Sequence, residues 1–230
     1  AKAYEFKAGE ASGTTTTLVS KETIGSTEKN YTYDKKGNIL SISTTAGTIT
    51  YTYDLISQLT KETNGITGET IDYTYDTGGN ILSKTITKDG VSTTTNYGYN
   101  DTNWKDKLTS FDGQNILYDQ IGNPLSLNGA TLGWTQGRKL STYTKDGTTA
   151  YYTYDENGIR KSKYVNGVTT EYLTSGGEVV AQKTGSNVIT YTRGGDGKLI
   201  SMNRNGTVYY YQTNLQGDVE KILNASGTVV

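Results

Sequence analysis

Aspartates recur along this chain beside tyrosines, and they are the residues that first suggest chemistry. Asp34, Asp54, Asp76, Asp119 and Asp155 each directly follow a tyrosine. Two carboxylates facing one cleft could act as the acid and base of a glycoside hydrolase, and several together could bind calcium. The sequence selects no facing pair, and it lacks the tight Gly-Gly-x-Gly-x-Asp spacing of calcium solenoids. Because each aspartate precedes a turn-forming run, we interpret them as turn formers and expect no metal site.

Several other chemistries are excluded by composition. The chain contains no histidine and no cysteine. This excludes Ser-His-Asp and Cys-His nucleophilic sites, disulfides and ordinary zinc sites. The glycine-rich run at residues 194–197 lacks the Lys-Ser/Thr pair that follows a phosphate-binding loop, because Lys198 is followed by Leu199. We therefore expect a protein that is not an enzyme, with no catalytic residue and no cofactor.

The aspartates belong to a repeated unit, Tyr-x-Tyr-Asp followed by a short run containing glycine and then by aliphatic residues. Residues 31–40 and 73–82 show it most clearly, and weaker copies begin near residues 134, 172, 191 and 209. Side chains alternate along a strand, so the two tyrosines share one face, while the glycine suits a left-handed turn position. The predicted structural motif comprises Tyr31, Tyr33, Asp34, Gly37, Tyr51, Tyr53, Asp54, Tyr73, Tyr75, Asp76, Gly79, Tyr97, Tyr99, Tyr118, Asp119, Gly122, Tyr152, Tyr154 and Asp155.

A second kind of turn lies between the repeats. Asn-Gly and Asp-Gly pairs, which are strong hairpin signals, stand between strand-like runs. They are Asp89-Gly90, Asn128-Gly129, Asp146-Gly147, Asn166-Gly167 and Asn205-Gly206. Two alternating turn types predict a meander of roughly 20 strands, and sheets beyond about ten strands curl. We therefore predict an all-β fold, a long meander of antiparallel β-hairpins coiled into a curved or spiral sheet.

The overall composition agrees with this prediction. Only 33% of the 230 residues are hydrophobic, which is low for a compact single core, yet the chain has 20 tyrosines. A net charge of −1 with mixed signs gives no basic stripe for nucleic acid. No apolar run approaches the roughly 20 residues of a membrane-spanning helix.

The aromatic residues leave two interpretations open. Rows of tyrosines favour cross-strand packing between neighbouring hairpins. Aromatic faces also stack on sugars, so the tyrosines, Trp104 and Trp134 could instead form a carbohydrate-binding surface. Packing is the simpler interpretation for both residue types.

The repeated unit resembles the YD-repeat, or Rhs-repeat, family. The family motif is Y-x-Y-D-x-x-G-N, which residues 31–38 and 73–80 match directly, and the resemblance covers residues 31–230. Residues 209–218 resemble the closing part of such arrays, with Gln212 and Asn214 near the positions where the family often has His and Asp. The Asp-Pro motif of self-cleaving family members is absent, because Asn123 precedes the single proline, Pro124.

The resemblance implies a hollow shell of spiralling hairpins that encloses a C-terminal toxin or effector domain. It also implies a secreted or bacterial cell-surface location. We expect divergent N-terminal strands at residues 1–30, the repeat array at 31–208, and a closing segment at 209–230 that stops before any toxin domain. We expect self-association through exposed strand edges. The alternative is a surface module that binds glycans or mediates adhesion.

Overall fold

The structure is a computed structural model that describes residues 2–214 and 217–230, and the regular elements it describes there are all β-strands. The prediction of an all-β antiparallel meander is confirmed. The strands are β1 (Lys2–Ala8), β2 (Thr15–Ile24), β3 (Thr27–Tyr33), β4 (Ile39–Thr44), β5 (Gly47–Tyr53), β6 (Leu59–Asn64), β7 (Glu69–Tyr75), β8 (Ile81–Lys88), β9 (Val91–Gly98), β10 (Ser110–Phe111), β11 (Gln114–Asn115), β12 (Ser126–Leu127), β13 (Ala130–Thr135), β14 (Lys139–Lys145), β15 (Thr148–Tyr154), β16 (Arg160–Val165), β17 (Val168–Ser175), β18 (Glu178–Thr184), β19 (Asn187–Arg193), β20 (Leu199–Arg204), β21 (Thr207–Thr213) and β22 (Val219–Leu223).

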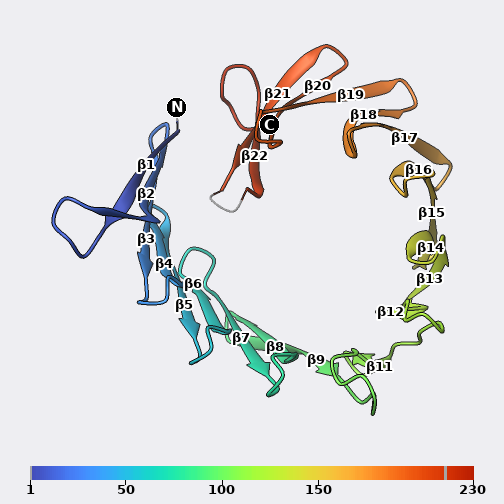
Figure 1. The fold of residues 1–230 in the computed structure, drawn as a ribbon, viewed down its shortest axis with the longest axis horizontal. Helices are drawn as coiled ribbons and strands as arrows, with labels where there is room; N and C mark the ends of the chain where they lie inside the picture. The colour runs from blue at the N-terminus through green and yellow to red at the C-terminus, as the bar shows by residue number, and fades with distance from the viewer. Residues whose placement is uncertain (1, 215–216) are drawn as a thin grey trace. The chain divides into compact units, whose positions relative to one another are not determined.

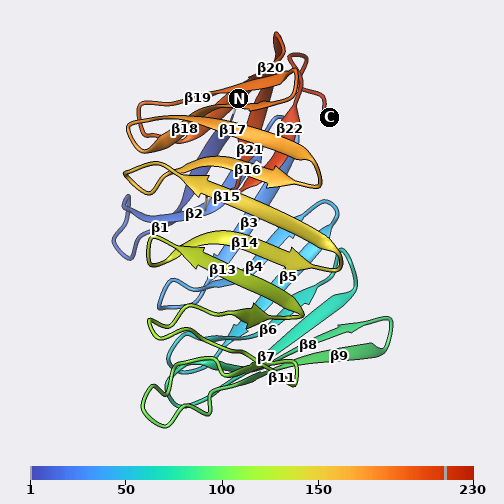
Figure 2. The same ribbon diagram turned by 90° about the vertical axis from the view of Figure 1, so that its right-hand side faces the viewer.

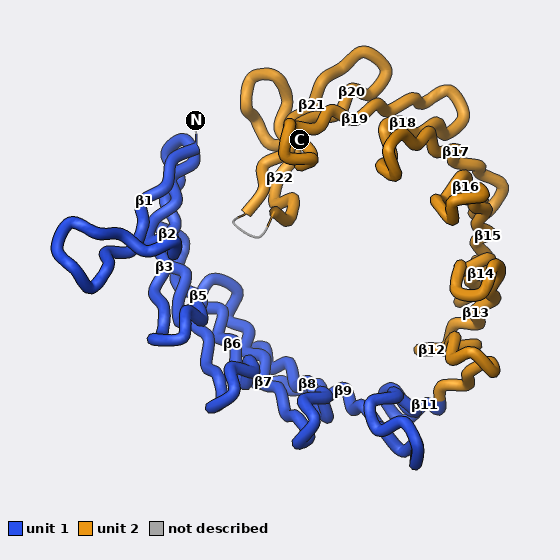
Figure 3. The backbone as a smooth tube through the Cα atoms, in the orientation of Figure 1, with its two compact units in different colours: residues 1–115 blue, residues 116–230 orange. Residues whose placement is uncertain are grey.

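The strands form two 11-stranded sheets, each following chain order, β1 to β11 and β12 to β22 (Figure 1). Two compact units correspond to them, residues 1–115 and 116–230 (Figure 3). In each unit every strand pairs with its neighbours in sequence, and hairpin turns line both edges (Figure 2). The predicted boundaries at 30/31 and 208/209 stay predictions, and residues 1, 215 and 216 within them lie outside the described part.

The chain forms two sheets where a single long sheet was expected. Strands β10, β11 and β12, which flank the break, are two residues each. Pro124 lies in this stretch and makes only an isolated bridge, with Tyr118. Proline has no backbone N–H and cannot donate to a ladder, so it interrupts a sheet at this point.

Two kinds of hairpin alternate, as the two turn types predicted. In the first kind, which we call D-loop hairpins, five-residue loops at 34–38, 54–58, 76–80, 119–123 and 155–159 follow the motif tyrosines. Their strands pair up to the loop, with a register shift at the last pairs, as between Thr32 and Tyr33. Such bulges bend a strand and increase its twist, and they recur at the same place in successive repeats.

The second kind, which we call inter-repeat hairpins, joins one D-loop hairpin to the next, and five of these hairpins are built on the predicted Asn-Gly and Asp-Gly turns. Both residues of each predicted pair have positive φ, for example 49° at Asp146 and 75° at Gly147. That conformation defines the type I′ turn that fits strand twist. These hairpins pair only near the turn: the β4–β5 ladder ends at Ser41–Thr50, so the strands are unpaired toward the D-loop edge. We call each such opening a fork.

The sheets carry little closed core. The accessible surface is 14630 Å², against about 10,000 Å² for a compact monomer of this mass. Among the described residues, the buried apolar ones are Tyr31, Ile116, Ala130 and Ala150. The fold therefore depends on hydrogen bonds between neighbouring hairpins more than on a central core, as in repeat proteins.

One fully buried charge lies in the first sheet. Glu22 on β2 is 0% exposed, and its carboxylate lies 2.8 Å from Lys2 Nζ and 4.0 Å from Lys29 Nζ. Tyr31 Oη donates to the same carboxylate at 3.2 Å. Strands β1, β2 and β3 are thus joined through one side chain.

Replacement of Glu22 by Gln is expected to destabilise the first unit. The amide removes the buried negative charge that the partly exposed ammonium groups of Lys2 and Lys29 face, at a cost of about 1–3 kcal/mol. The measurement is the urea midpoint, with Glu28→Gln on the exposed rim of the same strands as a control. Equal midpoints for the two variants would contradict a role for the buried charge.

Candidate functional site: the repeat unit and the ties between repeats

The motif aspartates close the D-loops with their side chains. Asp34 Oδ1 accepts from the amides of Lys36 at 2.8 Å and Asn38 at 2.9 Å, and its Oδ2 accepts from Asn38 Nδ2 at 2.8 Å. Asp76 and Asp119 make the same three bonds, and Asp54 and Asp155 make the two amide bonds. At residue 214 the pair is inverted, since Asn214 Nδ2 donates to Asp218 Oδ2 at 3.0 Å.

These contacts lower the pKa of three of the loop carboxylates. Hydrogen bonds from Asn38, its side chain first, lower the pKa of Asp34. The same bonds from Asn80 lower the pKa of Asp76, and the Asn123 amide lowers that of Asp119. Asp34, Asp76 and Asp119 therefore act as ionised hydrogen-bond acceptors within their turns.

The motif asparagine also reaches the next loop along the sheet. Asn38 Nδ2 donates to Ser57 Oγ at 3.0 Å, and Asn80 Nδ2 donates to Asp106 Oδ1 at 3.1 Å. In the second unit, Asn123 Nδ2 donates to the Gly137 carbonyl at 2.7 Å. The final residue of Y-x-Y-D-x-x-G-N therefore both closes its own loop and holds the following one.

The second tyrosine of each unit crosses a fork. Tyr53 Oη donates to the Ile39 carbonyl at 2.9 Å, and Tyr75 Oη donates to the Leu59 carbonyl at 2.7 Å. Tyr33 and Tyr154 make equivalent bonds to Val19 at 2.7 Å and Leu140 at 2.8 Å. We call these bonds fork ties. Each ends on the residue that pairs with the second aromatic position of the preceding repeat, as Ile39 pairs with Tyr33.

Two degenerate repeats keep the tie with other side chains. Trp134 Nε1 donates to the Pro124 carbonyl at 2.7 Å, and Pro124 pairs with Tyr118 of the preceding repeat. Arg193 stands at the same position of a later repeat and forms an ion pair with Glu178 at 2.8 Å. The position therefore requires a donor of sufficient reach, and a phenol is one way to supply it.

The other predicted motif residues lie along the same edge. Tyr31, Tyr51, Tyr73, Tyr97 and Tyr152 lie within strands β3, β5, β7, β9 and β15, whereas Tyr99 and Tyr118 lie outside the named strands. Gly37, Gly79 and Gly122 occupy left-handed positions with φ between 84° and 91°. Ring-on-ring contacts join Tyr97 to Phe111 and Tyr151 to Tyr164. The recurring contact of the second tyrosines is instead the hydroxyl-to-carbonyl tie, which sequence reasoning missed.

The motif residues do not converge on one cleft. Successive repeats leave separate open hollows along the D-loop edge, one of about 580 Å³ that Tyr51, Tyr53, Asp34 and Asp54 help to line. A second, of about 370 Å³, lies one repeat further on, between Asp54 and Asp76. Among the described residues, no cluster of three or more acidic side chains is placed to hold a metal ion.

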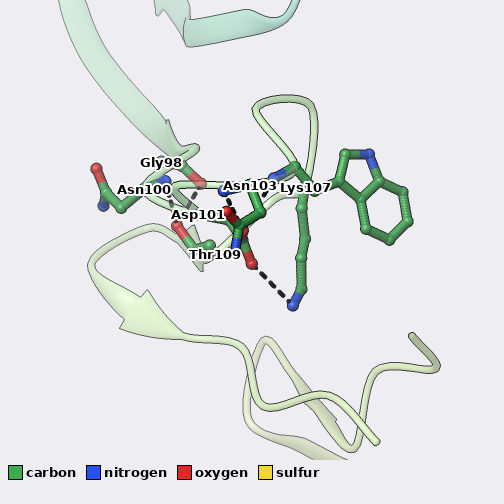
Figure 4. Close-up of polar contacts among 7 residues, drawn as sticks. Gly98, Asn100, Asp101, Asn103, Lys107 and Thr109 are labelled. Carbon is green, nitrogen blue, oxygen red and sulfur yellow. Dashed lines mark hydrogen bonds and ion pairs between the residues drawn. The ribbon is translucent and has the colours of Figure 1, made fainter. Parts of the chain in front are cut away.

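The fourth repeat has a longer loop, residues 99–109, held by one carboxylate (Figure 4). Asp101 Oδ1 accepts from the amides of Asn103 and Trp104, both at 3.0 Å, and Oδ2 faces Lys107 Nζ at 3.1 Å. These donors, the two amides first, lower the pKa of Asp101 to about 2. The Trp104 side chain on this ordered loop is 52% exposed, so the packing interpretation fits Trp134 better than Trp104.

The repeat geometry defines a YD-type β-hairpin array, and comparison with known proteins gives the family. A sequence model of the teneurin YD-shell family matches residues 14–230, and the chain belongs to this family. The recognition of YD repeats in the sequence is therefore confirmed. The described residues form no helix that could cross a membrane.

Among curated proteins, the chain is similar to WapA nucleases of Bacillus. It is 37% identical over 182 residues to the tRNA3(Ser)-specific nuclease WapA of Bacillus spizizenii, covering 76% of this chain and 8% of that protein. It is 36% identical over 185 residues to the tRNA nuclease WapA of Bacillus subtilis strain 168, covering 77% and 8%. The chain thus spans about a twelfth of these relatives' length.

Solved structures share the fold. A TcdB2–TccC3–TEV crystal structure matches with a TM-score of 0.75 and 18% identity over all of this chain and 14% of that one. A Tc holotoxin pore of Photorhabdus luminescens matches with a TM-score of 0.72, the same identity and the same coverage.

Replacement of Tyr53 by Phe is expected to loosen the β4–β5 fork. The substitution removes the hydroxyl bond to Ile39 and leaves its carbonyl without that donor, at a cost of about 0.5–1.5 kcal/mol. Tyr164→Phe is the matched control, because the Tyr164 hydroxyl has no hydrogen bond within the described residues. Urea unfolding compares the two, and equal midpoints would show that the tie does not stabilise the sheet.

Replacement of Asp34 by Asn is expected to lower the melting temperature more than replacement of Asp54 by Asn. In Asp34→Asn the new side-chain NH₂ group faces the Asn38 Nδ2 group, so two hydrogen-bond donors oppose each other. In Asp54→Asn no side-chain donor of the described residues faces the new NH₂ group, because Asp54 accepts only from two backbone amides. The pKa of Asp34 is lower in the folded protein than in the unfolded chain, where it is about 4. The wild-type protein should therefore lose stability as the pH falls from about 4 through the folded pKa of Asp34. Asp34→Asn should flatten this acid dependence, and thermal melts between pH 2 and pH 7 measure both effects.

Proposed function

We propose that this chain is a segment of a shell that encloses a C-terminal toxin or effector domain of a longer natural protein. The observation that supports the proposal is the sequential tying of hairpins: neighbouring hairpins are joined by the backbone ladder, and in several repeats the motif asparagine and the fork tie add further bonds. A wall built this way gives a continuous hydrogen-bonded barrier without a core. Its action is steric, since it separates a cargo from solvent and proteases, and no residue of the wall takes part in a reaction.

The relatives support the same proposal. WapA proteins are named as tRNA nucleases, but the region that matches this chain is a small part of each of them. On this chain, the match falls on the YD repeats. We therefore assign any catalytic activity to a domain other than this one. A secreted or cell-surface location follows from the proposal, as does pairing of the free edges of β1 and β22 in an isolated segment.

Protease protection in the full natural protein tests the enclosure. Limited trypsin digestion should leave the domain that follows the repeats intact, while the same domain expressed alone is degraded. The triple variant Tyr53→Phe, Tyr75→Phe, Tyr154→Phe should increase cleavage of the domain, and Tyr151→Phe, Tyr164→Phe should not. Equal cleavage of the domain within the wild-type protein and alone would refute enclosure.

Carbohydrate binding remains a second candidate, because Trp104 is half exposed on a loop held by Asp101. Exposed aromatic faces on ordered loops are common anchors for ligands. A titration on a glycan array tests this candidate. Binding that Trp104→Ala abolishes while the fold is retained would favour it, whereas Trp134→Ala would act through loss of a fork tie.

A further inference from the structure

Inter-repeat hairpins pair only near their turns, so each fork depends on side chains to hold its open end. Four forks are held by a tie from a motif tyrosine, namely Tyr33, Tyr53, Tyr75 and Tyr154. The backbone ladders of the β14–β15, β16–β17 and β18–β19 hairpins have the same extent, for example Thr142–Tyr151 to Lys145–Thr148 in β14–β15 and Ser162–Glu171 to Val165–Val168 in β16–β17. Differences in strength between forks therefore come from side chains.

The β16–β17 fork has Thr174 where the tie donor stands. Thr174 follows the register shift of its D-loop hairpin and pairs with Val179, as Tyr33 pairs with Ile39 after the corresponding shift. By the rule of the other ties, its acceptor would be the carbonyl of Arg160, the residue that pairs with Tyr154. A threonine hydroxyl is too short for a contact that tyrosine, tryptophan and arginine make elsewhere. Within the described residues Thr174 makes no side-chain hydrogen bond.

No other side chain replaces the missing tie. The Arg160 guanidinium instead stacks on the Tyr152 ring of β15, 4.5 Å from its centroid. In the described part of the chain, no side-chain hydrogen bond, ion pair or ring contact joins β16 to β17. The loop before this fork ends in Ile159, which cannot make the inter-loop bond of Asn38 or Asn123.

Several other inter-repeat hairpins carry at least one such contact. Lys61 pairs with Asp72 at 3.1 Å across β6–β7, and Thr87 bonds Ser92 at 2.8 Å across β8–β9. Thr144 and Thr149 bond at 3.1 Å across β14–β15, and Arg193 pairs with Glu178 across β18–β19. The β16–β17 hairpin is thus held by its backbone ladder and turn alone.

We infer that the β16–β17 fork opens before the neighbouring β14–β15 and β18–β19 forks, from the D-loop edge toward the Asn166-Gly167 turn. In an array where each hairpin contacts only its neighbours, local opening follows the weakest interface. If the chain is part of an enclosing shell, as proposed above, this fork is where the wall would open, and that consequence rests on the proposed function. The difference in opening between the forks does not depend on it. The fork itself is testable whether or not a cargo is enclosed.

Hydrogen–deuterium exchange of the wild-type chain is the first measurement. Amides of residues 160–162 and 171–174 should exchange faster than the equivalent amides of the β14–β15 and β18–β19 forks. Equal or slower exchange at β16–β17 would overturn the inference.

Thr174→Tyr is the decisive variant, because it supplies the donor that the other repeats have. It should slow exchange at this fork about 2- to 10-fold, the effect of one hydrogen bond. Ser175→Tyr, on the opposite face of the same strand, is the control and should leave exchange unchanged. Unchanged exchange in the folded Thr174→Tyr protein would refute the role of the tie.

A loss-of-tie variant keeps the test decisive if Thr174→Tyr does not fold. Tyr154→Phe should raise exchange at the β14–β15 fork toward the rate of the β16–β17 fork. No increase there would also overturn the inference, since it would show that the ties do not control opening.

Discussion

The bond from the second tyrosine to a carbonyl of the preceding repeat is the contact on which this architecture depends. A type I′ turn can join two strands, but here the ladder that it starts ends after about half of their length, as in β14–β15, β16–β17 and β20–β21. Without a further contact, successive D-loop hairpins would separate at their loop edge. The phenol has the length to cross the opening and a hydroxyl to satisfy a carbonyl that the ladder leaves unpaired. Burial, the main cause, raises the pKa of Tyr53 and Tyr75, so the hydroxyl stays a neutral donor far above neutral pH.

The remaining features of the repeat serve this contact. The register shift next to each D-loop places the second tyrosine at the strand end, where it can lean across the fork. The aspartate fixes the loop through amide bonds, and the asparagine holds that loop against its successor. Ser57 shows how strongly the loop backbone is imposed, since a non-glycine residue takes φ of 68° where Gly37 and Gly79 stand in other copies. Its hydroxyl accepts the Asn38 bond, which offsets part of the conformational cost.

The sequence was sufficient for the parts of the fold that depend on local periodicity. Alternating side chains, Asn-Gly turns and repeated Asp residues predicted antiparallel hairpins with two turn types, and the structure has them. The break near Pro124 was not predicted, although the missing N–H was visible, because the repeat pattern continued through it. The buried Glu22 was also missed, since nothing local distinguishes it from exposed glutamates. The ties were missed because they join residues about 14 positions apart through a hydroxyl, and the motif was interpreted as ring packing.

The chemistry of the tie also explains how such arrays tolerate sequence change. Tyrosine, tryptophan and arginine all occupy the same position here. Tyr154 and Trp134 donate to the equivalent carbonyl of the preceding repeat, whereas Arg193 pairs with the carboxylate of Glu178, next to the equivalent residue. What is constrained is the reach of the side chain and the presence of a donor, rather than the identity of the residue. A fold that specifies contacts at this level can keep its hairpin geometry while its sequence diverges, as the match to toxin shells at 18% identity shows. It also allows individual interfaces to be weakened by one substitution without loss of the ladder, because the backbone hydrogen bonds do not depend on which side chain stands at the fork.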